Sequence, residues 1–378
     1  MKGTGSGRAI VIGAGIIGLT LARELAARHW KTTILEKGNP GREASRAAAG
    51  MLAPHLEFHD SPRLLSVGVQ ARDLYPEFVA ELERETETWV DLRLEGILAP
   101  VLSPQTARDE VSNGATLLDR ARLEVLEPSL SERIRSVLFY PQDGSVDNRA
   151  LVRALRISCR KRGVQIETHA PVEEILVDAD KVTGVRTGTR DLEADIVINC
   201  AGAWSGQISL PGARIQVRPV KGQMLLLQRT SQRQDAAPTR TIYSGTSYVV
   251  PRGDGRVIVG TTVEDRGYDQ SIESSAVANL LQGAIEICPN LASARFVEAW
   301  AGLRPLCVRE DAPEGGEELP FVGPLGPTGS FVACGHYRNG ILFAPLTAKV
   351  MADCIENPSS ALAASFCLDD SVEPSQAS

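Results

Sequence analysis

The stretch Arg8–Gly18, RAIVIGAGIIG, decides the fold of this chain. Its first five residues are an apolar run that predicts a short buried strand. The apolar spacing of Ile16–His29 predicts a helix directly after the glycines, and Thr32–Leu35 predicts a second strand. A strand, a glycine-rich turn, a helix and a second strand in this order are typical of the opening of a doubly wound α/β sheet.

Each glycine of the motif GAGIIG has its own physical role. Gly13 permits the tight turn, Gly15 allows the backbone to approach a pyrophosphate, and Gly18 lets the helix pack on the strand. The anion would lie on free N–H groups at the start of the helix. Glu36, at the end of the second strand, can accept both ribose hydroxyls and would repel a 2′-phosphate, which disfavours NADP. The motif alone does not choose between FAD and NAD.

Composition excludes several classes of protein. The 378 residues suit about two domains, and a net charge of −7 argues against nucleic acid or an anionic membrane as partner. The seven cysteines include no CxxC pair, so we expect no metal site and a reducing, cytoplasmic compartment. Glycines interrupt the first apolar run, and no other stretch reaches the roughly 18 apolar residues that span a bilayer. We therefore expect a soluble protein.

The middle of the chain alternates between helix and strand signals. Pro62–Glu87 predicts a long amphipathic helix that Pro76 kinks or splits. The loop at Gly41–Gly50 is rich in small residues. Asn148 is predicted to cap a helix that runs to about Arg162.

From Arg214 to Thr262 the apolar period becomes two, which predicts an antiparallel sheet. Buried strands of the first type return at Asp195–Cys200 and Phe331–Cys334. The predicted fold class is therefore α/β, with a discontinuous Rossmann-like nucleotide-binding domain and an inserted antiparallel-sheet substrate domain. The first comprises residues 1–60, 146–213 and 326–378, and the second comprises 61–145 and 214–325.

Three further segments carry a resemblance to a known family. They are residues 43–52 (EASRAAAGML), 199–205 (NCAGAWS) and 335–341 (GHYRNGI). Together with the glycine motif they resemble the D-amino-acid oxidase superfamily of FAD-dependent oxidoreductases, and AAAGML and GHYRNGI are most similar to its glycine oxidases. The resemblance extends from Ile10 to about Ala352, and it implies that the nucleotide is FAD.

Two of these segments also have a physical interpretation. The segment Ala47–Gly50 has only small side chains, so its backbone could lie flat against an isoalloxazine ring. Gly335 and Gly340 bracket a strand-to-helix turn whose helix would direct its positive end at the N1–C2=O edge of the flavin.

The resemblance implies non-covalent FAD and a set of contacts along the chain. Cys307 leaves one alternative open, a covalent bond to the flavin as in sarcosine oxidases, although a small strand residue is the favoured interpretation. His336 is expected to offer its backbone rather than to act as a base. The implied FAD contacts are Gly13, Gly15, Ile16, Ile17, Gly18, Glu36, Lys37, Ala44, Ser45, Ala49, Gly50, Met51, Val172, Gly202, Trp204, His336, Tyr337, Arg338, Asn339, Gly340, Ile341 and Leu342.

A substrate carboxylate needs a cation, and arginine matches a carboxylate with two parallel hydrogen bonds. By resemblance, Arg304 would hold the carboxylate, Tyr248 would donate its hydroxyl to it, and Arg338 and Met51 would border the substrate. The remaining histidines have no recognisable partner in the sequence and are predicted to be surface or packing residues: His29, His55, His59 and His169.

The implied reaction is oxidative deamination of glycine, sarcosine or a small D-amino acid. Hydride would pass from the neutral amine to flavin N5 without a general base. The imine would hydrolyse to glyoxylate and ammonia, and oxygen would be reduced to hydrogen peroxide. The resemblance also implies a homo-oligomer such as a tetramer and supply of the glycine imine to thiamine biosynthesis. The alternatives are a D-amino-acid or cyanide-forming glycine dehydrogenase with another electron acceptor, and an NAD-binding or flavin-carrying module without turnover.

Overall fold

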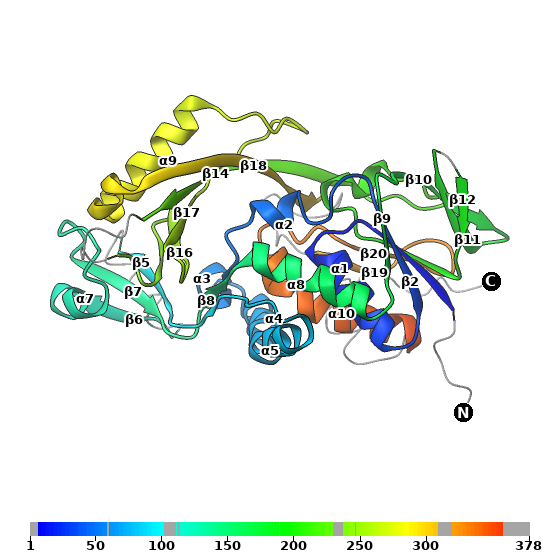
Figure 1. The fold of residues 1–378 in the computed structure, drawn as a ribbon, viewed down its shortest axis with the longest axis horizontal. Coiled ribbons are helices and arrows are strands. Elements are labelled where there is room, and N and C mark those ends of the chain that lie inside the picture. The colour runs from blue at the N-terminus through cyan, green and yellow to red at the C-terminus, as the bar shows by residue number, and fades with distance from the viewer. Residues whose placement is uncertain are drawn as a thin grey trace.

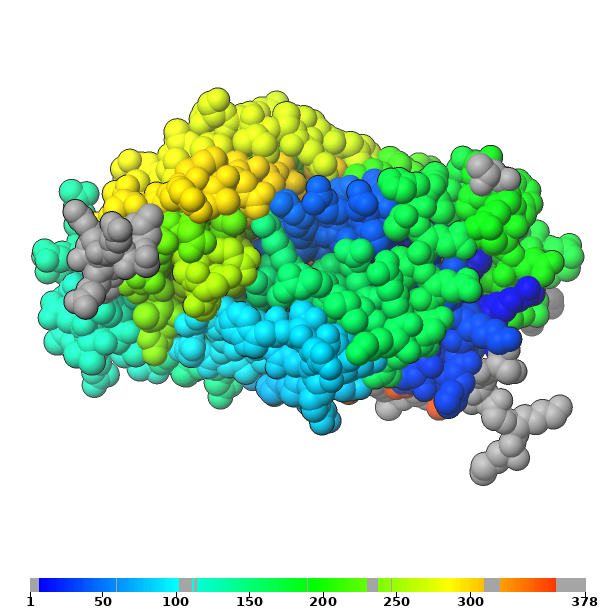
Figure 2. All heavy atoms as spheres, in the orientation of Figure 1, coloured from blue at the N-terminus to red at the C-terminus, as the bar shows by residue number. Residues whose placement is uncertain are grey.

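The computed structural model describes residues 7–58, 60–101, 111, 114–188, 190–229, 237–245, 247–308 and 320–357. Two large sheets form the two ends of an elongated molecule (Figure 1). In the space-filling view, the yellow and gold segment near residues 250–300 extends along the top, above the blue N-terminal segment (Figure 2). This α/β architecture with an inserted sheet is the fold class that the sequence predicts.

The nucleotide-binding end contains a six-stranded sheet in the order β19-β20-β13-β1-β2-β9. All neighbouring strands are parallel except β19, which pairs antiparallel with β20. The strands are β1 (Arg8–Ile12), β2 (Lys31–Glu36), β9 (Gln165–Thr168), β13 (Ile196–Asn199), β19 (Phe321–Pro324) and β20 (Ser330–Cys334).

The alternation of side chains along β1 explains why this sheet is covered on both faces. Ala9 and Val11 belong to the core that contains the helices, whereas Ile10 and Ile12 pack against a small three-stranded sheet. A strand that is buried on both faces has apolar residues at successive positions, which explains the continuous apolar run in the sequence. The helices are α1 (Ile16–Ala27), α8 (Asn148–Lys161) and α10 (Gly340–Glu356), and the small sheet is β10 (Val172–Asp178), β11 (Lys181–Thr187) and β12 (Arg190–Glu193).

The other end is an eight-stranded sheet in the order β18-β14-β17-β16-β15-β5-β7-β6. Its neighbours are antiparallel except β15 and β5, which pair in parallel, so the sheet departs from the purely antiparallel prediction at one pair. The helix α9 (Ser274–Ile287) packs on β14 and β17. The strands are β5 (Ile97–Pro100), β6 (Thr116–Asp119), β7 (Ser136–Tyr140), β14 (Val217–Gln228), β15 (Thr241–Tyr243), β16 (Tyr248–Pro251), β17 (Arg256–Gly260) and β18 (Arg295–Cys307), with α7 (Arg120–Leu126) beside β6.

The two long strands β14 and β18 connect the two ends (Figure 1). They pair antiparallel from Val217–Cys307 to Gln228–Arg295 with one register shift near Leu226. In addition to its pairing with β14, Leu306 of β18 forms a bridge with His336, so the end of β18 reaches the nucleotide-binding domain.

Short elements occupy the junction between the two ends. The predicted loop at Gly41–Gly50 contains a one-turn helix, α2. The junction also contains a small sheet with the strand order β3-β8-β4. These elements are α2 (Ala44–Ala47), β3 (Met51–Leu52), α3 (Pro54–Glu57), β4 (Leu92–Arg93), β8 (Gly144–Val146), and the 3-10 helices η1 (Gly202–Gln207) and η2 (Pro289–Ser293).

The long helix predicted at Pro62–Glu87 is two helices, α4 (Pro62–Asp73) and α5 (Tyr75–Thr86), because Pro76 falls in the first turn of α5. They pack against α10 and α8 and share the core of the six-stranded sheet. The packing thus associates α4, α5 and β19 with the nucleotide-binding sheet, although the predicted domain ranges assign them to the substrate domain. The ranges remain a prediction, and their segments 1–6 and 358–378 lie outside the described residues.

The predicted N-cap of α8 is wrong by one residue. Asp147 caps the helix, because its carboxylate accepts the N–H groups of Arg149 and Ala150, each at 3.0 Å. Asn148 is instead the first helical residue, and its buried amide donates to the carbonyl of Ser45 at 2.7 Å. Asn148 therefore joins α8 to α2. Among the described residues, no helix has the length and apolarity to cross a membrane, and no group of three acidic, histidine or cysteine side chains could hold a metal.

Candidate active site

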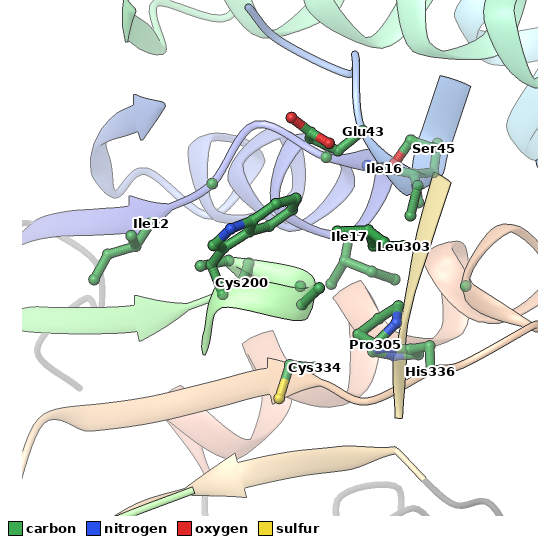
Figure 3. A pocket seen from close by; sticks show the side chains of 18 of the residues that line it. Ile12, Ile16, Ile17, Glu43, Ser45, Cys200, Leu303, Pro305, Cys334 and His336 are labelled. Carbon is green, nitrogen blue, oxygen red and sulfur yellow. Dashed lines mark hydrogen bonds between the residues drawn. The ribbon is translucent and has the colours of Figure 1, made fainter. Parts of the chain in front are cut away.

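A cleft opens at the carboxyl ends of β1, β2, β13 and β20, where doubly wound sheets bind their ligands. Figure 3 shows Cys200 near its middle, with Glu43 and Ser45 on one side and Cys334 and His336 on the other. The cleft continues beneath β18 at Leu303.

The glycine motif forms one wall of the cleft. Gly13 has a positive φ of 102°, and a Cβ there would lie 2.6 Å from the carbonyl oxygen of Cys200. A Cβ at Gly18 would lie 2.0 Å from the carbonyl oxygen of Gly13. Glycine is therefore required at both positions. Gly15 is the N-cap residue of α1 and has no side chain to accept the first N–H groups of the helix. The N–H of Ile16 donates instead to the Ser45 hydroxyl at 2.8 Å.

Glu36 is held at the end of β2 by two backbone donors. Its carboxylate accepts the N–H of Ala14 and the N–H of Gly38, each at 2.8 Å. A carboxylate offers about four lone-pair sites, so Glu36 can still accept hydroxyl groups from a ribose in the cleft.

Beyond Glu36, Trp204 borders the cleft, with Tyr268 packed on it. The ammonium of Lys37 lies 2.9 Å from the ring centroid of Trp204, and burial lowers the pKa of Lys37. The ring of Tyr268 packs on Trp204 at 5.7 Å, and its hydroxyl donates to the carbonyl of Ala203 at 3.0 Å. Tyr268 comes from the loop before α9, and no sequence motif marked it.

At the opposite end, a small hollow shares lining residues with the cleft and brings together Arg304, Arg338, Tyr248 and Met51. It also contains residues that sequence reasoning missed. These are Glu57, Gly222, Met224 and Thr261.

The guanidinium of Arg304 is fixed by acceptors on β14 and after β17. It donates to the hydroxyl of Thr261 at 2.7 Å and to the carbonyls of Lys221 and Thr262 at 3.2 Å. A Cβ at Gly222 would lie 2.3 Å from Arg304 Nη2, so glycine at this position makes room for the guanidinium. Burial lowers the pKa of Arg304, partly offset by Tyr248.

Arg338 has an acidic partner. Its Nη2 lies 3.6 Å from Oε1 of Glu57 and donates to the Tyr243 hydroxyl at 3.4 Å. Burial alone would lower the pKa of Arg338, but the charge of Glu57 and the contact with Tyr243 outweigh it and raise the pKa above its ordinary value.

Glu57 lies on α3, which is anchored by a dyad that the sequence did not reveal. Nδ1 of His55 lies 2.7 Å from Oδ1 of the buried Asp143, whose second oxygen accepts the N–H of Leu56 at 3.0 Å. His55, predicted to be a surface or packing residue, therefore has a buried carboxylate partner that the sequence did not reveal.

Tyr248 is buried against Met224, to whose sulfur its hydroxyl donates at 3.6 Å, and burial raises the pKa of this phenol. The phenol can therefore act as a neutral donor in the hollow. His336 is also buried. Burial lowers its pKa to about 3, and its Nε2 contacts the Thr347 hydroxyl at 2.9 Å. The imidazole is neutral and its Nε2 contacts α10 through Thr347, so it is no candidate for a base.

Most of the predicted cofactor residues border these spaces. Gly18 and Leu342 line neither space: Gly18 packs on β1, and Leu342 is fully buried in the core of α10. Four of the predicted cofactor residues line the hollow but not the cleft, namely Ala49, Gly50, Met51 and Asn339. The cleft is lined by Gly13, Gly15, Ile16, Ile17, Glu36, Lys37, Ala44, Ser45, Val172, Gly202, Trp204, His336, Tyr337, Arg338, Gly340 and Ile341.

The residues present fit FAD. Glu36 can take a ribose, the uncapped start of α1 can take a pyrophosphate, and the alanines of α2 leave a flat face for a ring. The start of α10, which Asn339 does not cap with its side chain, also borders the cleft and can stabilise negative charge there. Cys307 lines neither space, whereas Cys334 lines the cleft.

Comparison with known proteins points to one family. Residues 8–354 match the family model DAO, described as FAD dependent oxidoreductase. A protein named glycine oxidase from Pseudomonas aeruginosa is 34% identical over 92% of this chain and 94% of its own. The bifunctional protein ThiO/ThiG of Trichormus variabilis is 35% identical, and this chain spans 52% of its length. The crystal structure of glycine oxidase from Geobacillus kaustophilus superposes with a TM-score of 0.87 at 30% identity, covering 97% of this chain and 100% of that one.

Proposed function

This chain belongs to the DAO family of FAD dependent oxidoreductases, and we propose that it oxidises glycine to glyoxylate and ammonia, with oxygen as the electron acceptor. The observation that carries the proposal is the position of Arg304 and Tyr248 in a hollow that adjoins the cleft beside the alanines of α2. The names of the full-length relatives point to the same substrate.

The hollow selects a small amino acid. It encloses about 80 Å³, and alanines, glycines and Met51 are among the residues that line it. Arg304 supplies the positive charge that a carboxylate needs, and since its Nη groups donate to Thr261, Thr262 and Lys221, a bound carboxylate would share or displace these acceptors; Tyr248 adds a hydroxyl donor. Sarcosine and small D-amino acids remain secondary candidates because they add only a methyl group or a short side chain.

FAD, when bound, supplies the hydride acceptor and the ring that reduces oxygen to hydrogen peroxide. It would be held by Glu36 at the ribose, by the start of α1 at the pyrophosphate, and by the segments 44–51 and 336–341 at the ring. The task of Arg304 is to fix the carboxylate so that the α-carbon faces the ring.

The amine must be neutral before hydride leaves the α-carbon. Among the described residues of the hollow, Glu57 is the carboxylate, and it is paired with Arg338 rather than free to accept a proton. We therefore propose that the substrate loses its ammonium proton to water and that the oxidation speeds up as pH rises.

We further propose that the glycine imine is delivered to thiamine biosynthesis, which the resemblance to ThiO implies and the relatives named ThiO/ThiG favour. A homo-oligomer such as a tetramer and a cytoplasmic location are also proposals.

The test mixes the purified holoenzyme with glycine in air and follows hydrogen peroxide and glyoxylate together. Equal amounts of both support the oxidase. Bleaching of the flavin by glycine without air, combined with no peroxide in air, would instead establish the dehydrogenase alternative. A flavin that glycine never bleaches would exclude glycine as substrate.

A further inference from the structure

Two thiols from different sheets approach each other behind the cleft. Cys307 ends β18 and Cys334 ends β20, and their Sγ atoms lie 4.0 Å apart. Both carry thiols rather than a disulfide. Neither sulfur has a role in the function proposed above.

The backbone at this point is arranged so that the two strands come very close. The bridge between Leu306 and His336, together with the hydrogen bond from Tyr337 N–H to the Pro305 carbonyl at 3.0 Å, sets Cys307 beside Gly335. A Cβ at position 335 would lie 2.1 Å from Cys307 Sγ. Any larger residue at position 335 would displace the Cys307 sulfur from Cys334.

The two thiols differ in exposure. Cys334 is 2% exposed and lines the cleft, and the neighbouring Cys307 and burial together raise its pKa. Cys307, at the end of its strand, is only partly buried. Since the thiolate is the reactive form of cysteine and access decides which thiol meets an oxidant first, Cys307 is the thiol that reacts first.

We propose that Cys307 and Cys334 form a peroxide-oxidisable dithiol beside the FAD cleft. The Cys307 thiolate attacks hydrogen peroxide, the O–O bond breaks, and hydroxide leaves and takes up a proton, which gives a sulfenic acid. The sulfur of Cys334 then displaces the hydroxyl from Cys307 and loses its own proton. The net change is two thiols and one peroxide to one disulfide and two waters, with two electrons taken from the sulfurs.

The geometry is within reach of this bond. A disulfide needs a separation of about 2.05 Å, so the two sulfurs, 4.0 Å apart, must approach by about 2 Å, and the bond requires rotation of the partly buried Cys307 side chain. That the oxidant is hydrogen peroxide made in the same cleft rests on the proposed function.

The test starts from reduced holoenzyme and adds hydrogen peroxide without glycine. After alkylation and digestion, mass spectrometry should find a Cys307–Cys334 linked peptide that dithiothreitol converts back to two alkylated peptides. Cys307→Ser should abolish the link, and Cys159→Ser, at a buried thiol on α8, should retain it. Since Cys334 is buried and its substitution could unfold the chain, Cys307→Ser is the decisive variant.

A sulfinic acid on Cys307 with Cys334 unmodified, or two unmodified thiols, would overturn the proposal. A second arm replaces the added peroxide with glycine in air, with and without catalase. A link formed by added peroxide but not by glycine would support the dithiol and count against the oxidase. A link formed by glycine and suppressed by catalase would support both.

Discussion

Arg338 and Glu57 face each other in the substrate hollow, with Nη2 and Oε1 3.6 Å apart. The carboxylate neutralises Arg338, so that Arg304 is the guanidinium without a carboxylate partner among the described residues of the hollow. One uncompensated cation suits a substrate with one carboxylate. This division of the two arginines leads to the first two predictions.

Arg304→Ala should raise the KM for glycine sharply while leaving FAD bound. Loss of a charged hydrogen-bonded contact in a desolvated site costs on the order of 2–4 kcal/mol, or roughly 30- to 900-fold. Steady-state kinetics and the visible flavin spectrum measure both quantities. Arg266→Ala, at an exposed arginine, is the matched control. Unchanged glycine kinetics would remove Arg304 from the site.

Glu57→Gln should leave Arg338 with an uncompensated charge and admit a second anion. We expect kcat/KM for the dicarboxylate iminodiacetate to rise relative to that for glycine by about tenfold, which corresponds to about 1.4 kcal/mol. The ratio of the two kcat/KM values is the measurement, because a general loss of activity would lower both. An unchanged ratio would show that Glu57 does not control the charge of the substrate.

Tyr268→Ala should weaken the binding of FAD. The variant loses the ring that packs on Trp204 at the edge of the cleft, a contact that contributes about 0.5–1.5 kcal/mol. Titration of apoprotein with FAD should give a Kd about 2- to 12-fold higher, with kcat unchanged at saturating FAD. Tyr268→Phe retains the ring and loses the hydroxyl contact with Ala203. If this variant binds FAD as poorly as Tyr268→Ala does, the stacking argument fails.

His336 should make the protein less stable in mild acid. Its pKa is about 3 in the fold, because of burial, against about 6.5 when unfolded, so the unfolded chain binds more protons between these values. The contribution of neutral His336 is complete above pH 6.5 and decreases as pH falls towards 3. From pH 7 to pH 5, it should lower the free energy of unfolding by about 2 kcal/mol. Urea unfolding at both pH values should show a smaller loss in His336→Asn than in the parent protein. Equal losses would contradict the assignment.

The fold could be predicted largely from local pattern. The run at Arg8–Ile12, the glycines after it and the change to period two beyond Arg214 each depend on neighbours in sequence, and the fold class they imply is confirmed. The residue at which a helix begins was harder to predict where two neighbouring side chains could cap it. Asp147 rather than Asn148 caps α8 because its carboxylate accepts two N–H groups.

The site was only partly accessible to sequence reasoning. Glu57 lies on a four-residue helix that has no pattern of its own, and it meets Arg338 only because α3 is anchored to Asp143. Tyr268 likewise reaches Trp204 from a loop distant in sequence. Contacts between segments far apart in the chain leave no local periodicity, so a single sequence could not reveal them. The roles assigned to the individual residues stay predictions until the variants above are measured.

The ladder between β14 and β18 runs in register from Val217–Cys307 to Leu226–Glu298, and Arg304 lies within it. Such a ladder gives the two ends of the molecule no hinge along this connection (Figure 1). If Arg304 anchors the substrate carboxylate as proposed, capture of substrate spends little free energy on reorganisation, because the ladder already fixes the backbone of Arg304. The site would then select among amines by a shape and charge that exist before the ligand binds. It would not depend on a domain closure that the ligand must drive.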